Sequence, residues 1–535
     1  MSSEPTAFIT LDRGGASVAV ALVGRLDRRW RLLGSLAAPA AVADDVILRG
    51  LAARFQESDP ELADVLGVRE DEIELLPQLR ARSVPPVTMA VLAGSDRSLA
   101  VLEDVAARTG WRTVSASAES HDPGAMTELC LARDVSALLV GAGEPPAADE
   151  RGALDELAAL AGAVAVRRRE LTVVLAGAIA GHRAHFPTVD GRRSDVVAAP
   201  APTAGDPPGS ELHDILERLR DTPADSRTAI VRAAATVARV LDRRIEVLEI
   251  GFDGGLRAMI SPDPGGGAPR IQAVASAEAA LVPPDIDDTV VERISSWSTA
   301  PIDRYRMTDR LRELRTAPWS DAAGDGARLR LAAARAALAR LAELTQDLGS
   351  LPPPDLTIVA GGAFAVAPGP AVVLAVADVI RRSGATQLAA DHARVLGPLG
   401  TINDDEEALS ILWDLVDDVL APLGGVIIPA GLRSGRPAGK VVVHGPIGDA
   451  ERDLAAGQVE HIPLAPGEHA VAAFEFRDGA RLGGRGRSVV VEVAGGVAGL
   501  LVDLRDVPLR LPDRAERRRD ALAGWQRATW AETES

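Results

Sequence analysis

The sequence predicts an α/β protein of two lobes followed by a mainly β domain. Its 535 residues exceed what one hydrophobic core usually organises, and 47% of them are apolar against 25% charged, the balance of a folded chain. Short apolar strands alternate with helical segments from residue 87 to residue 178, a rhythm typical of parallel sheets. From residue 425 onward, short β-type runs recur between Gly and Asp residues.

The first lobe is expected over residues 1–195. It opens with a strand that ends on Asp12, a glycine turn and two further strands, and a helix is expected over about residues 43–55. Strands and helices then alternate, so this part should form a parallel sheet covered by helices on its faces. A Pro- and Gly-rich linker with one helix is expected over 196–224.

A second lobe is expected over residues 225–415. Its helix 229–241 leads into the strand of IEVLEIGFDG, and a long Ala- and Leu-rich helix covers 326–347. The apolar strand of DLTIVAGGAF and a helix that begins near Pro370 follow. Residues 425–535 are expected to form a mainly β C-terminal domain that ends in a polar helix.

Charge and composition exclude several kinds of partner and site. The net charge of −18 disfavours nucleic acid, because its phosphates would be repelled. The single cysteine, Cys130, excludes an internal disulfide, and its place in a predicted helix favours a buried thiol. No apolar stretch reaches the roughly 18 residues that span a bilayer, and the first residues lack a signal-peptide pattern. We therefore expect a cytoplasmic protein with no membrane partner.

Three glycine turns that follow apolar strands form the candidate nucleotide-binding site. Backbone N–H groups in such turns approach phosphates closely, and a carboxylate at a strand end can orient a metal-bound water. Each turn alone is equally typical of a simple tight turn, so the hypothesis depends on their order and spacing. The candidate residues are Asp12, Gly14, Gly15, Ser17, Glu249, Gly251, Asp253, Gly254, Gly361, Gly362 and Ala363.

These blocks, in this order, resemble the MutL-type proteins associated with glutamate mutase, members of the actin, sugar-kinase and heat-shock-chaperone ATPase superfamily. ITLDRGGAS, LEIGFDGGLRAMIS and LTIVAGGAFAVAP are similar to the family's nucleotide turns, and LAADHARVLGPLGTI to a later stretch. The C-terminal block from HIPLAPGEHAVAAFEF to AGLLVDLRDVPLRLP resembles the extension of longer members. The resemblance implies two ribonuclease-H-like lobes of the actin and sugar-kinase type around a nucleotide cleft. It also implies an accessory or chaperone-like role for an adenosylcobalamin-dependent mutase.

The chain departs from that family at the residues that would hold ATP. Gly15 and Ala16 stand where a Ser-Thr pair is expected, which leaves Ser17 as the hydroxyl of the first turn. Glu249 replaces an Asp, the Thr-Thr-Asp that should follow is lost, and a GGTDGG-like stretch is reduced to 141–146. Each lost phosphate contact costs about 1–3 kcal/mol. The sequence therefore predicts degraded or lost ATP binding, and at most a weak ATPase.

Two hypotheses about function stay open. In the first, Asp12 and Asp253 hold Mg²⁺, and residual ATP binding drives an accessory protein for a cobalamin enzyme. In the second, the chain is a non-catalytic scaffold that keeps the fold without nucleotide and binds a protein partner. A small-molecule kinase is disfavoured because no phosphoryl-transfer base is visible. The run GRPAGK (435–440) lacks P-loop spacing, and His182-x-x-His185 lacks a third metal ligand.

Overall fold

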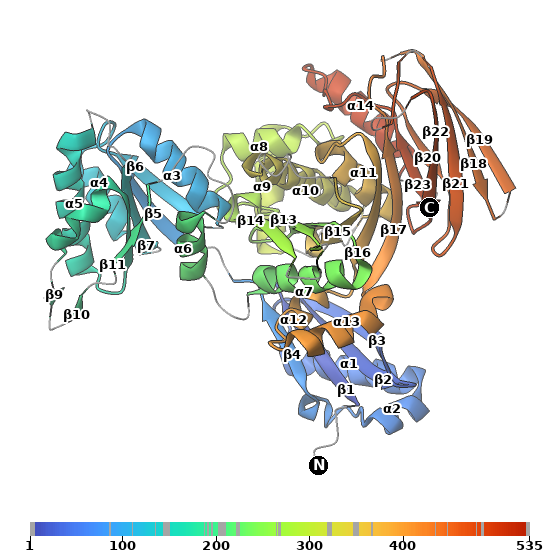
Figure 1. Ribbon diagram of the computed structural model, residues 1–535, viewed down its shortest axis with the longest axis horizontal. Coiled ribbons are helices and arrows are strands. Elements are labelled where there is room, and N and C mark those ends of the chain that lie inside the picture. The colour runs from blue at the N-terminus through green and yellow to red at the C-terminus, as the bar shows by residue number, and fades with distance from the viewer. Residues whose placement is uncertain are drawn as a thin grey trace.

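The structure is a computed structural model, in which four units are visible (Figure 1). A small lobe carries the N-terminus, a larger lobe lies at the centre, an α/β domain stands to one side, and β-sheets and a helix form the C-terminal part. The described residues are 6–84, 87–109, 111–133, 135–142, 150–186, 188–189, 192–193, 196–201, 210–220, 225–263, 265, 269–317, 324–345, 353–364, 367–433, 435–446, 448–477, 479–482 and 486–530.

The first lobe is built on a four-stranded sheet with the order β3-β2-β1-β4, in which β2 is antiparallel to β1 and β4 is parallel to it. The strands are β1 (Ala7–Arg13), β2 (Ser17–Leu26), β3 (Arg29–Pro39) and β4 (Gln78–Arg82). Helices α1 (Asp44–Ser58) and α2 (Pro60–Leu66) and the 3₁₀ turn η1 (Ile73–Leu75) bury their apolar residues against one face. Strands β1 and β2 read as near-continuous apolar runs because both faces of the sheet are covered.

Residues 88–199 form a separate sheet of five parallel strands with the order β11-β8-β7-β5-β6. The strands are β5 (Thr88–Ala93), β6 (Arg112–Ser117), β7 (Val135–Ala142), β8 (Thr172–Gly177) and β11 (Val196–Ala199). Helices α3 (Asp96–Arg108) and α6 (Glu211–Arg220) cover one face. Helices α4 (Pro123–Leu131) and α5 (Glu150–Arg167) and the turn η2 (Ala178–His185) cover the other. The strands β9 (Thr188–Val189) and β10 (Arg192–Arg193) form a small hairpin.

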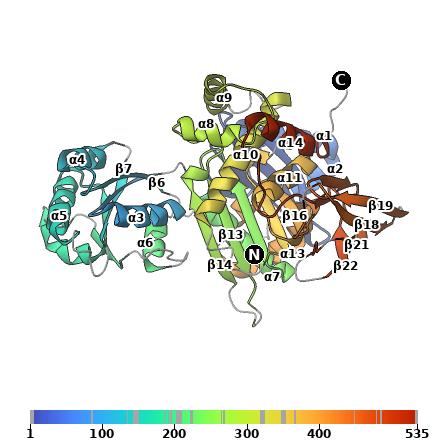
Figure 2. The ribbon, with the colours of Figure 1, turned by 90° about the horizontal axis from the view of Figure 1, so that it is seen from above.

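This inserted α/β domain, residues 88–220, stands apart from the rest of the molecule when seen from above (Figure 2). Its parallel sheet is the arrangement that the alternation of strands and helices predicts. Cys130 lies buried in α4, as the sequence predicted, and burial raises the pKa of its thiol to about 12. The thiol is therefore protonated and packs as a small apolar group.

The second lobe contains a sheet with the order β14-β13-β12-β15-β16. Strand β13 is antiparallel to β12 and β14, whereas β12, β15 and β16 run parallel, which is the ribonuclease-H-like arrangement. The strands are β12 (Ile245–Ile250), β13 (Gly255–Ser261), β14 (Arg270–Ser276), β15 (Leu356–Ala360) and β16 (Gly384–Asp391). The first lobe repeats this order as far as its fourth strand. The predicted fold class, with two such lobes, is confirmed.

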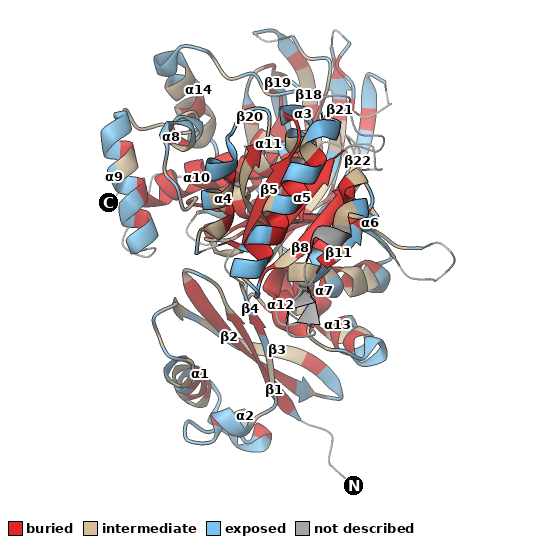
Figure 3. Ribbon diagram, turned by 90° about the vertical axis from the view of Figure 1, so that its left-hand side faces the viewer, coloured by how far each residue is buried: buried red, intermediate tan, exposed pale blue. Residues whose placement is uncertain are grey.

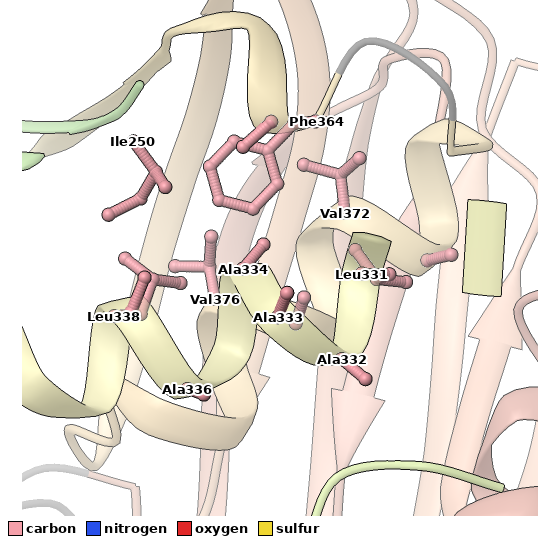
Figure 4. Close-up of a cluster of buried hydrophobic side chains, with 14 of the residues drawn as sticks. Ile250, Leu331, Ala332, Ala333, Ala334, Ala336, Leu338, Phe364, Val372 and Val376 are labelled. Atoms are coloured by element: carbon pink, nitrogen blue, oxygen red, sulfur yellow. The ribbon is translucent and has the colours of Figure 1, made fainter. Parts of the chain in front are cut away.

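Helices cover both faces of the second sheet. On one face lie η3 (Ala277–Ala279), α8 (Asp288–Ser295), α9 (Arg304–Thr316), α10 (Gly324–Leu344), η5 (Gly362–Phe364) and α11 (Gly369–Val379). Their core joins Ile250, Leu338, Phe364 and Val376 (Figure 4). On the other face lie α7 (Ser226–Leu241), α12 (Leu396–Leu399) and α13 (Asp405–Val419). Their core also contains Phe8 of the first lobe, so the two lobes share one hydrophobic core.

The C-terminal part continues the second sheet with β17 (Leu420–Ile428), β23 (Leu500–Asp503) and β20 (Val459–Ile462). A second, antiparallel sheet contains β19 (Gly448–Ala455), β18 (Pro437–Gly445), β21 (His469–Phe476) and β22 (Ser488–Ala494). Buried residues alternate with exposed ones along β21, as expected for a strand with one face on the core. The two sheets enclose a shared apolar core and form a sandwich, and helix α14 (Ala515–Arg527) follows.

Buried ion pairs fasten this sandwich to the second lobe. Arg505 contacts Asp378 of α11 at 2.6 Å and Asp503 of β23 at 2.6 Å, and Trp525 of α14 lies over the Arg505 guanidinium at 4.6 Å. Arg335 of α10 also pairs with Asp378. The red, buried residues in Figure 3 therefore run from the apolar cores into a charged one. Among the residues described, no helix is long and apolar enough to cross a bilayer.

Candidate functional site

A cavity of about 180 Å³ lies between the two lobes, where the three glycine turns converge. The turns meet because β1, β12 and β15 each end at the same side of their sheets. The predicted residues that line it are Asp12, Gly14, Gly15, Ser17, Glu249, Gly251, Asp253, Gly361, Gly362 and Ala363. Gly254, which was also predicted, is not among the lining residues, and its backbone packs beside the Ser276 carbonyl.

The turns of the two lobes lie in close contact across this cavity. A Cβ placed on Gly15 would lie 3.7 Å from the Asp253 carboxylate, and one on Gly362 would lie 3.7 Å from the Ser17 hydroxyl. Gly361 has a φ of +87°, and a Cβ there would lie 2.3 Å from the Ile250 carbonyl oxygen. Only glycine fits that position, because the left-handed backbone and the close approach both exclude a side chain.

Asp12, at the end of β1, is held by an arginine from the far end of the sequence. Arg394 Nη2 lies 2.7 Å from Asp12 Oδ2, and Arg394 Nη1 donates to the Ser17 hydroxyl at 2.6 Å. The Ser226 hydroxyl, at the start of α7, donates to the other Asp12 oxygen at 3.0 Å. The Asp12 carboxylate, only 8% exposed, is therefore neutralised and hydrogen-bonded on both oxygens.

Glu249 and Asp253 share one buried arginine. Arg227 Nε donates to Glu249 Oε2 at 2.9 Å, and Arg227 Nη2 donates to Asp253 Oδ1 at 2.7 Å. The hydroxyl of Ser83, just beyond β4 of the first lobe, donates to Asp253 Oδ2 at 2.7 Å. The second lobe thus contributes the pair of acids, while α7 and the first lobe supply their hydrogen-bond donors.

Burial and charge shift the acids of the cleft in opposite directions. Burial raises the pKa of Glu249 to about 7, although the Arg227 charge opposes it. Burial likewise raises the pKa of Asp391 to about 7, against the N–H groups of Val395 and Leu396 that its carboxylate accepts. Burial acts to raise the pKa of Asp253 as well, but Arg227 and the Ser83 hydroxyl outweigh it and hold that pKa below its usual value. Asp253 is the charged partner of Arg227 near neutral pH.

Stability is expected to fall as the pH rises from 5 to 7. Glu249 and Asp391 titrate near 7 in the folded chain, above their ordinary pKa values of 4.5 and 3.8, so the folded chain binds more protons over this range. Their contribution is complete below those ordinary values and is lost as the pH passes through 7. Urea unfolding at pH 5 and pH 7 measures the fall, which should be smaller in Glu249→Gln. An equal fall in that variant would contradict the assignment.

Reasoning from the sequence missed the partners of these acids. The missed residues of the cleft are Ser83, Ser226, Arg227, Asp391 and Arg394. One signal was available, because LAADHARVLGPLGTI contains Asp391 at a strand end and Arg394 in the turn that follows. Arg227 gave no such signal, since it reads as an ordinary residue of a helix.

The donor set was compared with what Mg²⁺ and a nucleotide require. Mg²⁺ takes an octahedral set of oxygen ligands and tolerates little crowding. Asp12 and Asp253, the predicted ligands, each contact a guanidinium at 2.7 Å, which a divalent cation would have to displace or repel. The cavity of about 180 Å³ is also smaller than the roughly 300–1,000 Å³ of small-molecule sites. In this arrangement of the lobes, the residues do not fit Mg²⁺ with a nucleotide.

Comparison with known proteins finds likeness in solved structures. No family model matches the chain, and no curated protein matches its sequence. A ROK family glucokinase from Streptomyces griseus in complex with glucose and AMPPNP is similar at 14% identity, with 73% of this chain and 97% of that one covered and a TM-score of 0.25. A Ppx/GppA family member from Aquifex aeolicus is similar at 8% identity over 76% and 87% of the two chains, with a TM-score of 0.18.

A PilM-PilN type IV pilus biogenesis complex is similar at 13% identity over 76% of this chain and 97% of that one, with a TM-score of 0.22. Likenesses of this size say nothing about activity, and the fold assignment rests on the strand orders described above.

Two weaker motifs have ordinary structural places. GRPAGK leads into β18, where Lys440 contacts Glu475 at 3.4 Å, as expected for a turn before a strand. His182 Nε2 lies 3.2 Å from Asp155 Oδ1. The side chain of His185 lies outside the described residues, as does most of the degraded stretch 141–146.

Proposed function

We propose that this chain is an accessory protein that retains the two-lobed fold and does not hydrolyse ATP. One observation carries the proposal: Arg394 and Arg227 occupy the acids that would otherwise hold the metal, with contacts of 2.7 Å to Asp12 and to Asp253. The cations that close the cleft belong to the chain itself. Lobe closure is then set by protein contacts and not by nucleotide.

The hydrogen bonds of the cleft support this role because they join the lobes directly. The first lobe contributes Asp12 and the Ser83 hydroxyl. Their partners, Arg394 and Asp253, come from the turns after β16 and β12. These contacts hold the lobes in one orientation, as a rigid platform for a protein partner would require.

Nucleotide is expected to leave the thermal stability unchanged. Millimolar ligand at a micromolar site would stabilise the fold by about 4 kcal/mol, so a live site would be plain in a thermal-shift titration. We expect no change of Tm with 1 mM ATP or ADP and Mg²⁺. Asp12→Ala serves as the matched control. A rise in Tm for the unaltered chain that disappears in Asp12→Ala would overturn the proposal in favour of a nucleotide-driven accessory cycle.

The partner that we propose is an adenosylcobalamin-dependent mutase. Its support is the resemblance of ITLDRGGAS, LAADHARVLGPLGTI and the C-terminal block to proteins associated with glutamate mutase. Affinity purification of the tagged chain from its own cells tests this, with the corrinoid absorbance of the eluate as the readout. A partner without corrinoid would favour the alternative, a scaffold for another protein.

A further inference from the structure

A second cleft lies where the inserted α/β domain meets the second lobe (Figure 1). Its volume is about 340 Å³, within the roughly 300–1,000 Å³ of small-molecule sites, which often lie at domain junctions. Helix α6 of the inserted domain forms one wall. Helix α7 and strands β13 and β14 of the second lobe form the other. A ligand in this cleft would contact both units at once.

Two buried polar atoms from residues of this cleft have no hydrogen-bond partner within the described part of the chain. They are Nε of Arg220 and Oδ1 of Asp225. Arg220 uses Nη1 to donate to the Thr109 carbonyl at 2.9 Å. Asp225 is 4% exposed and uses Oδ2 to accept from the N–H and hydroxyl of Thr228. A buried donor or acceptor left unpaired costs about 1–3 kcal/mol, so one free donor and one free acceptor side by side call for a bound group.

The remaining walls divide into a charged part and an apolar part. Arg218 and Arg232 add positive charge near Arg220. The apolar part, from α7, β13 and β14, contains Val231, Leu256, Ile271, Ala273 and Ala275. Ile271 is 43% exposed, although it is a large apolar residue. A bound apolar group would cover it and remove that surface from water.

We propose that this cleft binds a small zwitterion of the α-amino acid class with an apolar side chain. The ligand carboxylate accepts from Arg220 Nε, and the ligand ammonium donates to Asp225 Oδ1. The side chain packs on the wall around Leu256 and Ile271. No step of this inference depends on the proposed loss of ATPase activity. Arg227 lines both this cleft and the interlobe cavity, so a ligand here would also contact the residue that holds Glu249 and Asp253.

A divalent cation is the competing occupant of the same cleft. His213, Asp214 and Glu217 of α6 bring ligand atoms within 4.8 Å of one another, but both acids are exposed. Four arginines line the cleft, namely Arg218, Arg220, Arg227 and Arg232. Their charge disfavours a cation and favours a group with a carboxylate.

Thermal-shift titration of the full chain tests the proposal with defined probes. The probes are L-valine, L-leucine, L-methionine and L-phenylalanine, together with two analogues of leucine that each lack one charged group. These analogues are 4-methylpentanoate, without the ammonium, and 3-methylbutylamine, without the carboxylate. At least one amino acid should raise Tm, and both analogues should bind at least tenfold more weakly than leucine if leucine binds. No shift with any amino acid, equal shifts with the analogues, or a shift with ZnCl₂ alone would overturn the proposal.

Variants locate the site. Asp225→Asn keeps an oxygen for the Thr228 cap and removes the charge, and Arg220→Gln removes the guanidinium. Each should weaken amino acid binding at least tenfold. Arg239→Gln, an exposed arginine of α7 outside the cleft, is the matched control and should bind as the unaltered chain does. If the charge variants fail to fold, Ile271→Trp fills the cleft from its exposed wall and should abolish binding. Unchanged affinity in Ile271→Trp, or in both charge variants, would contradict the assignment.

Discussion

Replacing Arg227 with methionine is expected to lower the stability of the second lobe by about 3–5 kcal/mol. The guanidinium is 6% exposed and pairs with Glu249 and Asp253, whose side chains are themselves buried. Methionine fills much of the volume but leaves two carboxylates without a cation in a low-dielectric site. Because the domains of this chain need not unfold together, native-state hydrogen exchange of the β12 amides is the suitable measurement.

The control for this prediction is Arg310→Met on the exposed helix α9. Arg310 contacts Glu313 at 3.3 Å, with more than half of each side chain exposed, and such pairs contribute about 0–1 kcal/mol. The loss in Arg227→Met should also be larger at pH 8 than at pH 6, because Glu249 titrates near 7 and can take up a proton at the lower pH. A loss no larger than that of the control would show that Arg227 does not organise the cleft.

Replacing Arg505 with methionine is expected to cost a similar amount, about 3–5 kcal/mol, at the junction with the C-terminal sandwich. Arg505 is 1% exposed and holds Asp378 and Asp503, which are as deeply buried. Its loss also removes the cation under the Trp525 ring. Hydrogen exchange should rise in β23 and α14 first, because these elements lie on either side of the guanidinium.

Lys440→Met provides the matched control in the same sandwich. Lys440 contacts Glu475 at 3.4 Å on the outer face, where the pair is solvated and contributes little. Protection of α14 should be unchanged in this variant. If Arg505→Met left the exchange of β23 and α14 as it is in the control, the charged core would not be what fastens the sandwich to the second lobe.

The parts of the fold that depend on local pattern could be predicted from the sequence. The apolar strand before each glycine turn is evident, and it brought ten residues of the candidate site to one cavity. Helix α9 was harder to recognise, because only Met307, Leu311 and Leu314 of its residues are buried and the rest is charged. Helix α13 was recognised only by its acidic start at Asp404–Glu407.

Long-range pairing could not be predicted in the same way. Alternation of strands and helices does not reveal that the strands after Thr88 pair with one another and not with β4. Nor does the run of short strands near the C-terminus reveal that β17, β23 and β20 continue the sheet of the second lobe. Arg394 is 382 residues away from Asp12 along the chain. Departures from the family's nucleotide turns indicated what the cleft had lost, whereas the structure identifies the arginines that now occupy it.

Equilibrium dialysis of labelled ATP against the full chain, with and without Mg²⁺, tests the central claim most directly. The arginine contacts to Asp12 and Asp253 predict that the protein retains no nucleotide at 100 µM in either condition, a test concentration of about the level at which weak sites still bind. Asp253→Asn is the variant to run beside it. Retention that requires Mg²⁺ and disappears in Asp253→Asn would contradict the account, because it would show that the carboxylate leaves Arg227 to hold a metal.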